Sequence, residues 1–247
     1  MNEFLFCAET LPEAYHDSLC ALHKFGTESP VPDYSTKQKE ISVTMQILHP
    51  LQEPMISRLS FGGPRELEQY RQEMLDGILD FEVQRGNWAY TYHQRMEKQL
   101  PFIIRELRRN KDSRRAVIDV RDWLTDSESA DPACLQHIQY FIRDNALHCK
   151  VLFRSNDACK AAFMNMFALI MLQKRVADEL GVEMGTYTHR ANSYHVYKRD
   201  YALLDEYAKR INSHAPNTYN YIGEWDSYME ACKADIAKTV AKLKGGV

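Results

Sequence analysis

One stretch of this sequence constrains the fold more than any other, because it predicts a helix that is apolar on nearly every side. The stretch covers residues 161–181 and reads AAFMNMFALIMLQKRVADELG, with Gly181 ending the helix. A helix that is hydrophobic all round has to be buried. Because Asn165 interrupts the apolar run and Gln-Lys-Arg closes it, the run is too short to span a bilayer. We therefore expect a buried central helix and no membrane segment.

Asn165 is the exception within this apolar helix. A buried amide without a hydrogen-bond partner costs about 1–3 kcal/mol. Its carboxamide offers one acceptor and two donors, so either a protein group or a ligand can satisfy it. Asn165 is therefore a candidate ligand-binding residue.

Shorter patterns along the chain mix strands with helices. Ile41, Val43, Met45 and Ile47 alternate with polar neighbours, which is typical of a strand. Further strands are predicted at 116–123, 135–144, 148–155 and 185–197, with a hairpin turn at RDNAL, and helices at 12–25, 64–81, the first part of 98–115, 200–212 and 225–244. The polar segments 26–38 and 125–133 are predicted as loops. Without a regular βαβ rhythm, this mixture indicates an α+β fold.

The composition argues against several kinds of partner and site. The net charge of −3 gives no reason to expect nucleic acid as an obligate partner. The six cysteines are scattered without a C-x-x-C pair, so we expect no zinc or other metal site and no disulfide framework. Free thiols indicate a cytoplasmic protein, and residues 1–16 lack the basic and long apolar regions of a secretory signal.

Cys134 is the candidate nucleophile. It follows Asp-Pro-Ala at the start of one predicted strand, and Arg154 stands near the end of the next. Antiparallel strands joined by a short turn bring these two residues to the same end of a sheet. A guanidinium there can stabilise a thiolate, which is the reactive form. The alternative is that Cys134 is a small buried hydrophobe, and spacing alone favours that alternative.

Other polar residues stand near strand ends. Arg114 and Arg115 precede one predicted strand, while Arg154 and Ser155 end another. Guanidinium groups bind phosphate bidentately and a serine hydroxyl adds a donor, so these residues indicate an anion site, although any single arginine is usually a surface residue.

A third polar group lies within a strand. Ser193, His195 and Tyr197 share one face of the predicted strand at 185–197, because side chains alternate between faces. This row of hydrogen-bonding groups either lines a sugar pocket or forms a solvated face.

These segments resemble one known family. The segment PACLQHIQYFIRDNALHCKVLFRSND resembles, without a gap, the active-site segment of thymidylate synthases, where a Pro-Cys nucleophile loop precedes an Arg-Ser-x-Asp motif. DSRR, SYHVY and GNWAYTYHQRM resemble the family's phosphate-binding arginine pair, His-x-Tyr motif and tyrosine loop, and residues 154–173 are similar to its short, archaeal-type branch. Several ordered motifs with matching spacing are a specific signal.

The resemblance implies one thymidylate synthase-like domain over residues 1–247, with a mixed, mostly antiparallel sheet, the buried helix and flanking helices. It assigns catalysis to three residues, Cys134, Glu66 and Tyr90. Seven residues are implied to bind the nucleotide dUMP: Arg154 and Ser155 its phosphate, Arg114 and Arg115 the phosphate from the other subunit of a homodimer, Asn165 the uracil edge, and His195 and Tyr197 the sugar. Asp157 is implied to contact the pterin of the co-substrate.

The implied reaction is reductive methylation of dUMP at C5, through addition of the Cys134 thiolate to C6. The co-substrate is 5,10-methylenetetrahydrofolate or a related methylene-tetrahydropterin, without a metal. Two alternatives stay open. A pyrimidine-nucleotide hydroxymethylase of the same superfamily uses water in place of hydride, and a homologue can bind nucleotides without turnover.

The sequence also departs from the family's pattern. Ala133 precedes the cysteine where the family usually has proline, and Asp131 replaces an apolar residue that keeps water from the intermediate. Asp131 therefore keeps the hydroxymethylase alternative open. The N-terminal arginine loop that closes on the phosphate is replaced by DYSTKQKE, in which either Lys37 or Lys39 can take its place.

Overall fold

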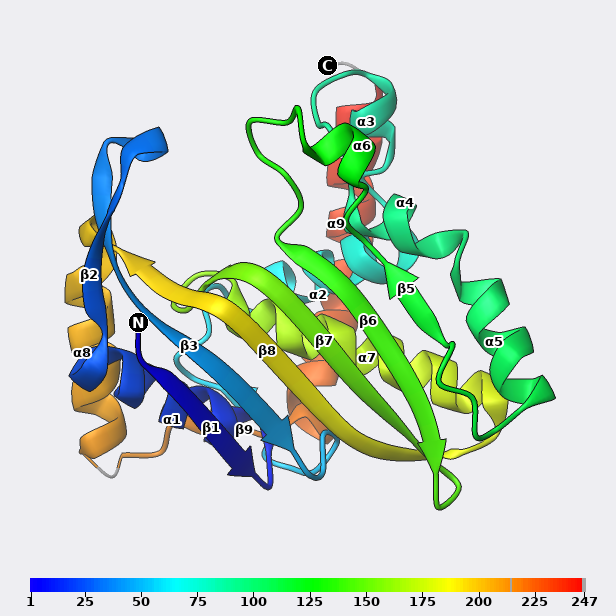
Figure 1. Ribbon diagram of the computed structural model, residues 1–247, viewed down its shortest axis with the longest axis horizontal. Helices are drawn as coiled ribbons and strands as arrows, with labels where there is room; N and C mark the ends of the chain where they lie inside the picture. The colour runs from blue at the N-terminus through cyan, green and yellow to red at the C-terminus, as the bar shows by residue number, and fades with distance from the viewer. Residues whose placement is uncertain (214, 246–247) are drawn as a thin grey trace.

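A mixed β-sheet organises the computed structural model, which describes residues 1–213 and 215–245 (Figure 1). Its strands are β1 (Glu3–Ala8), β2 (Thr27–Val31), β3 (Thr36–Ile47), β5 (Val117–Asp119), β6 (Leu135–Arg143), β7 (Ala146–Asp157) and β8 (Glu183–Tyr197). They run in the order β1-β3-β8-β7-β6-β5, with β2 paired to β3. The β1–β3 and β7–β8 pairs are parallel and the other pairs are antiparallel. A second small sheet joins β4 (Ile56–Ser57) to β9 (Thr218–Tyr219).

Helices lie behind and beside this sheet in Figure 1 and leave the face toward the viewer uncovered. They are α1 (Leu11–Phe25), α2 (Pro64–Asp76), α3 (Phe81–Gln84), α4 (Tyr92–Glu97), α5 (Leu100–Arg109), α6 (Trp123–Asp126), α7 (Ala162–Leu180), α8 (Tyr201–Asn212) and α9 (Asp226–Gly245). Short turns of other helix types cover Pro32–Tyr34, Lys198–Asp200 and Tyr221–Trp225. The mixture of a sheet with separate helices confirms the predicted α+β class.

The predicted central helix is α7, and it is buried as expected. Its residues Phe163, Phe167 and Leu169 are at most 1% exposed and belong to the main hydrophobic core. The helix packs against β7 and β8 on one side and against α2 on another. Gly181 follows with φ of +67°, a left-handed conformation that favours glycine and ends the helix.

The predicted hairpin between β6 and β7 is also confirmed. Asp144 and Asn145 form its turn with φ of +50° and +59°. Two consecutive left-handed residues give the tight turn whose twist matches that of antiparallel strands, and Asp and Asn tolerate this conformation best among residues with a side chain. The hairpin therefore fixes which residues of β6 and β7 face each other.

The loop prediction for 26–38 was wrong, because this segment forms β2, a helical turn and the start of β3. Two prolines led to the error. Pro30 lies in β2, an edge strand, where a missing N–H costs no sheet hydrogen bond when it faces outward, and Pro32 begins the helical turn. The helix predicted over 64–81 ends at Asp76, because Gly77 turns left-handed with φ of +63°.

Two absences concern the described residues only. No helix within 1–213 and 215–245 combines the length and apolar character needed to cross a membrane. The same residues contain no cluster of three or more His, Cys, Asp or Glu side chains placed to hold a metal ion. The cytoplasmic location stays a prediction.

Candidate active site

The β6–β7 hairpin brings Cys134 and Arg154 together, as the sequence predicts. The backbone N–H of Arg154 donates to the carbonyl of Cys134 at 2.8 Å. Its guanidinium donates from Nε to the Ala133 carbonyl at 3.0 Å and from Nη2 to the Pro132 carbonyl at 2.6 Å. The pairing of β6 with β7 shifts register just after Leu135. Arg154 therefore holds the loop that presents the cysteine, beside an irregularity of the kind that re-aims side chains near active sites.

Opposing effects act on the Cys134 thiol. Burial raises its pKa, the positive charge of Arg154 lowers it, and the carboxylate of Asp131 raises it again. Burial is the largest of these effects, so the pKa lies above its ordinary value and the thiol of the free protein is mainly protonated at neutral pH. Arg154 is the predicted partner of the thiolate, but its charge does not outweigh burial.

The adjacent ends of β7 and β8 bring four of the predicted residues together. The parallel register pairs Ser155 with Ser193 and Asp157 with His195. The rings of His195 and Tyr197 lie 4.8 Å apart, which confirms that they share one face of β8. The Ser193 hydroxyl has another partner, because it donates a hydrogen bond to Glu40 at 2.6 Å.

His195 is 3% exposed, and burial lowers its pKa, so the ring is neutral. Its Nδ1 lies 3.3 Å from the carbonyl of Ser193 and 3.4 Å from the hydroxyl of Ser155. Since a carbonyl only accepts, Nδ1 carries the proton, and Nε2 is left as an acceptor. Within the described chain the buried Nε2 has no hydrogen-bond partner, which is an open position for a donor group.

Asp157 closes the turn that leads into α7. Its Oδ1 accepts from the backbone N–H groups of Cys159 at 3.0 Å and of Lys160 at 2.9 Å. Oδ1 of Asp157 thus holds the backbone of this turn, whereas Oδ2 accepts neither of these two hydrogen bonds.

Asn165 lies in the first turn of α7 and is 4% exposed. Its Oδ1 accepts a hydrogen bond from the phenol of Tyr70, which projects from α2. No other side-chain hydrogen bond of Asn165 is found among the described residues, so its Nδ2 keeps its donors.

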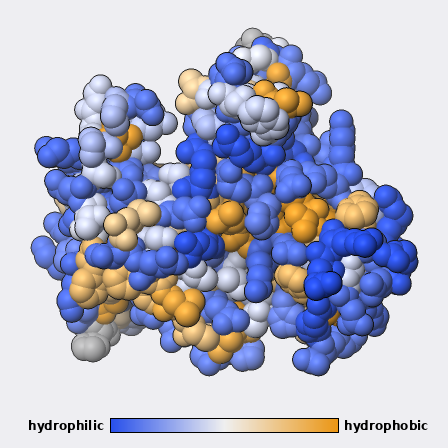
Figure 2. Space-filling view, viewed as in Figure 1, coloured by the Kyte–Doolittle hydropathy of each residue, from blue (hydrophilic) through white to orange (hydrophobic). Residues whose placement is uncertain are grey.

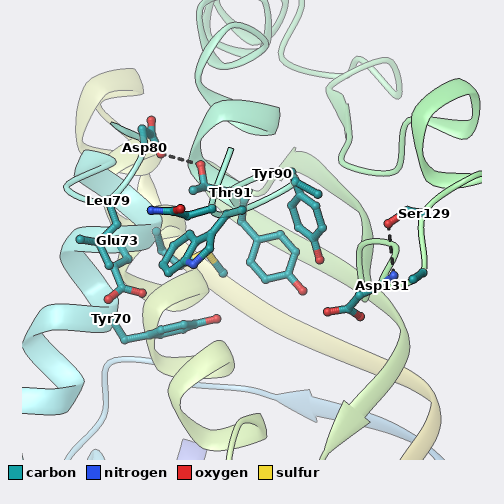
Figure 3. Close-up of a pocket in the computed structure, with 14 residues that line it drawn as sticks. Tyr70, Glu73, Leu79, Asp80, Tyr90, Thr91, Ser129 and Asp131 are labelled. Carbon is teal, nitrogen blue, oxygen red and sulfur yellow. Dashed lines mark hydrogen bonds between the residues drawn. The ribbon is translucent and has the colours of Figure 1, made fainter. Parts of the chain in front are cut away.

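A cavity of about 600 Å³ lies beside Tyr70, which forms part of its lining (Figure 3). Its lining comes from α2, from the segment that contains the tyrosine loop, and from the loop before Cys134, and it includes Tyr70, Glu73, Trp88, Tyr90, Tyr92 and Asp131. Burial, with the nearby Cys134 and Asp131, raises the pKa of Tyr90 to about 12. Figure 3 shows the Asp131 carboxylate on the opposite side of the cavity from Glu73, with Tyr90 between them. Aromatic faces with carboxylates at both ends suit a flat ring that carries N–H donors.

For three predicted residues, no contact with Cys134 is found among the described residues. Glu66 is exposed at the start of α2, and its Oε2 accepts from the backbone N–H of Gly63 at 2.8 Å. Arg114 and Arg115 are exposed before β5, whose Val117 pairs with Gln139 of β6. Gln139 lies five residues beyond Cys134 along β6, which is roughly 16 Å at about 3.3 Å per residue.

Sequence reasoning missed Tyr70 and Glu73. They follow Glu66 at steps of four and three residues, which places all three on one face of α2. Burial raises the pKa of the Glu73 carboxyl, which receives a hydrogen bond from Gln69 at 2.9 Å. The face periodicity was available in the sequence, but a polar helix face is usually solvated.

The two lysines considered for the phosphate, Lys37 and Lys39, each have another neighbour. Lys37 pairs with Glu28 at 3.8 Å, and the Nζ of Lys39 lies 5.4 Å from the ring centre of Tyr201. A second cavity of about 600 Å³ beside Tyr197 is lined by Tyr34, Ser35, Thr36, Tyr197 and Arg199. Neither lysine lines it, and its one cationic side chain among the described residues is Arg199.

The charge of Asp131 is expected to control the reactivity of Cys134. Asp131→Asn removes a negative charge that raises the thiol pKa, so more thiolate forms at a given pH and alkylation by iodoacetamide accelerates at pH 8. Peptide mass spectrometry across a pH series measures the rate at Cys134 alone. Asp178→Asn, a matched change at an exposed position on α7, should leave the profile unchanged. An unshifted profile for Asp131→Asn would contradict this electrostatic account.

Comparisons with known proteins agree on one family. A family model described as Thymidylate synthase matches residues 68–233. A protein of Methanocaldococcus jannaschii named "Putative thymidylate synthase" is 34% identical over 187 residues, covering 71% of this chain and 83% of its own length. One of the same name from Methanosarcina barkeri is 26% identical over 212 residues, covering 83% and 94%. The solved structure of thermostable thymidylate synthase A from Bacillus subtilis has the same fold, with a TM-score of 0.66 at 16% identity over 81% of this chain and 84% of that one. The chain belongs to the thymidylate synthase family.

Proposed function

We propose that this protein is a methyltransferase that converts dUMP to dTMP, with Cys134 as the nucleophile and a methylene-tetrahydropterin as co-substrate. The observation that carries the proposal is the position of Cys134. Arg154 holds its loop, and the thiol lies near Tyr70 and Tyr90, which line the cavity, while Tyr70 also donates a hydrogen bond to Asn165. A cysteine serving only as core filler would need neither an arginine-held loop nor a neighbouring cavity.

The nucleotide fits the polar groups along the strand ends. The Arg154 guanidinium has five N–H donors, and its two bonds to the loop leave others for a phosphate, to which Ser155 can add its hydroxyl. The unpaired Nε2 of His195 can accept from a sugar hydroxyl, beside Tyr197. These contacts fix the pyrimidine over Cys134, so binding energy is used to orient C6 toward the sulfur.

The protein's own groups perform the proton and charge steps. The Cys134 thiolate forms a bond to C6, and the electron pair of the C5–C6 double bond moves to C5, which becomes nucleophilic. Arg154 favours the thiolate, and burial keeps water from the charged centre. Once C5 has bonded to the one-carbon unit, a carboxylate takes the C5 proton, and the electron pair of that C–H bond would expel the pterin. The cysteine leaves after hydride or water has added to the exocyclic carbon, as the C5–C6 double bond forms again.

The cavity suits a reduced pterin. Trp88, Tyr90 and Tyr92 offer aromatic faces for the ring, and Asp131 can accept from its N–H groups. When bound, the methylene-tetrahydropterin supplies the one-carbon unit and, for methylation, the hydride.

A specific observation supports hydroxymethylation of dUMP as a second candidate. Asp131, which replaces an apolar residue of the family's pattern, lines the same cavity as Tyr90. A carboxylate there can hold a water molecule, and water in place of hydride gives a hydroxymethyl group.

Product analysis tests both functions. The protein with dUMP and methylene-tetrahydrofolate should yield a nucleotide heavier by one CH₂, whereas hydroxymethylation adds one further oxygen. Cys134→Ser should bind dUMP and lose turnover by several powers of ten, because a hydroxyl is a far weaker nucleophile. Cys149→Ser serves as the control, since Cys149 is buried on β7 outside the cavity. Near-normal turnover by Cys134→Ser would refute the covalent mechanism.

The identity of the proton-transfer carboxylate is a separate question. The resemblance points to Glu66, whereas Glu73 is the carboxyl of α2 that lines the cavity, so we assign the role to Glu73. Glu73→Gln should lower kcat for dTMP formation by about 10²- to 10⁴-fold, the usual contribution of a general base. Glu66→Gln is the matched change on the same helix face and should have little effect. The reverse result would restore Glu66.

The second subunit is the third part of the proposal. Arg114 and Arg115 are exposed and lie far from Arg154 of their own chain. The uncovered face of the sheet is mostly hydrophilic, with hydrophobic patches over its middle in Figure 2. The edge strand β1 carries Leu5, which is 76% exposed. A second copy seated there would cover this surface and let the arginine pair reach the partner's phosphate site.

Mixed dimers test this arrangement. Arg115→Ala and Cys134→Ser chains should each be inactive alone and regain activity when refolded together. One site of the mixed dimer carries both defects and the other carries neither. Each chain refolded with itself is the control. If heterodimers form without activity, Arg115 acts within its own subunit or outside the site.

A further inference from the structure

Asn165 alone does not determine which base is bound. Uracil presents an N3–H donor beside the O4 acceptor, whereas cytosine presents an N3 acceptor beside an N4 donor. A carboxamide can pair with either edge, because turning it by half a rotation exchanges its oxygen and its nitrogen. The specificity of the site therefore depends on the group that fixes the orientation of this amide.

Among the described residues, Tyr70 is the only side chain placed to fix the orientation of the Asn165 amide. Its phenol donates to Oδ1 of Asn165, and no other side-chain hydrogen bond to this carboxamide is found in residues 1–213 and 215–245. Asn165 is 4% exposed, so water has little access to replace a lost partner. The contact joins α2 to α7, two helices that pack against each other in the core.

The phenol acts as a donor here for two reasons. Burial, with nearby Glu73, Tyr90 and Cys134, raises the pKa of Tyr70 well above its ordinary value, so its proton is retained at neutral pH. Its proton also needs an acceptor. Figure 3 shows the Tyr70 ring reaching away from the Glu73 carboxylate, which already receives a hydrogen bond from Gln69 at 2.9 Å. Oδ1 of Asn165 is the acceptor that remains.

A donating phenol selects one orientation of the amide. With Oδ1 toward Tyr70, the oxygen keeps a second lone pair for N3–H, and Nδ2 keeps its hydrogens for O4. In the reversed orientation Nδ2–H would face the phenol, whose own proton would then lack a buried acceptor. We propose that Tyr70 sets the base specificity of this site by holding Asn165 in the orientation that binds uracil.

This inference rests on the proposed function, and nucleotide binding without the co-substrate tests it. Calorimetry measures Kd for dUMP and dCMP. Tyr70→Phe keeps the ring but removes the donor, so the preference for dUMP should fall by roughly ten- to a hundredfold. Asn165→Asp is the positive control, because an aspartate accepts from the cytosine N4 donor and should move the preference toward dCMP. Tyr15→Phe removes another buried phenol hydrogen bond, to the carbonyl of Ala158, and should leave the preference unchanged.

A double-mutant cycle separates positioning from general destabilisation. In an Asn165→Ala background Tyr70→Phe should no longer change the dUMP/dCMP ratio, because Tyr70 acts through the amide. Additive effects of the two changes, or an unaltered ratio in Tyr70→Phe, would overturn the inference and leave the proposed function standing. Failure of the unmodified protein to bind either nucleotide would instead overturn the proposed function. If Tyr70→Phe does not fold, Tyr70→Trp is measured instead, because it keeps an N–H donor on a ring. The inference then requires that Tyr70→Trp keep the full preference for dUMP.

Discussion

The burial of α7 is the constraint on which the rest of the structure depends. The first half of this helix is almost fully buried, which requires the sheet on one face and α2 on another. The strands that cover it, β7 and β8, carry Arg154, Ser155, His195 and Tyr197 near their ends, so packing the core also gathers these polar groups. The one amide near the start of α7 then needs a partner, which α2 supplies through Tyr70. If Asn165 binds the base as proposed, core packing and ligand recognition use the same helix–helix contact.

Local patterns in the sequence predicted much of this site. The alternation of β6 and β7, with a turn at Asp144 and Asn145, predicts that Cys134 lies beside Arg154, and the two are hydrogen-bonded neighbours in the structure. Two-residue periodicity likewise placed His195 and Tyr197 on one face. These predictions held because a hairpin and a single strand are specified by residues that are close in the chain.

Non-local pairings could not be predicted in the same way. β1 joins the sheet parallel to β3, with α1 and β2 between them in the chain. No residue pattern within 3–8 identifies β3 as the strand that pairs with β1. Pro30 and Pro32 made the sequence of β2 resemble a loop, because an edge strand tolerates prolines that a central strand excludes. Tyr70 and Glu73 were missed because a polar helix face has the same sequence pattern whether it contacts water or a cavity. Only the docking of α2 on α7 distinguishes the two.

The charges of Asp131 and Arg154 act in opposite directions on the pKa of the Cys134 thiol. The charge of Asp131 works against the chemistry that Arg154 favours, since it raises the pKa of the thiol that has to ionise. It also raises the pKa of Tyr90, across the same cavity. A carboxylate that opposes thiolate formation is compatible with covalent catalysis only if the bound state compensates for it. A donor from the co-substrate, such as a pterin N–H, would offset its charge and lower the thiol pKa when the site is filled. A water held there would leave the charge in place and stand ready to attack the one-carbon unit. Under the proposed function, the electrostatics of Asp131 therefore links the timing of cysteine activation to the choice between a methyl and a hydroxymethyl product.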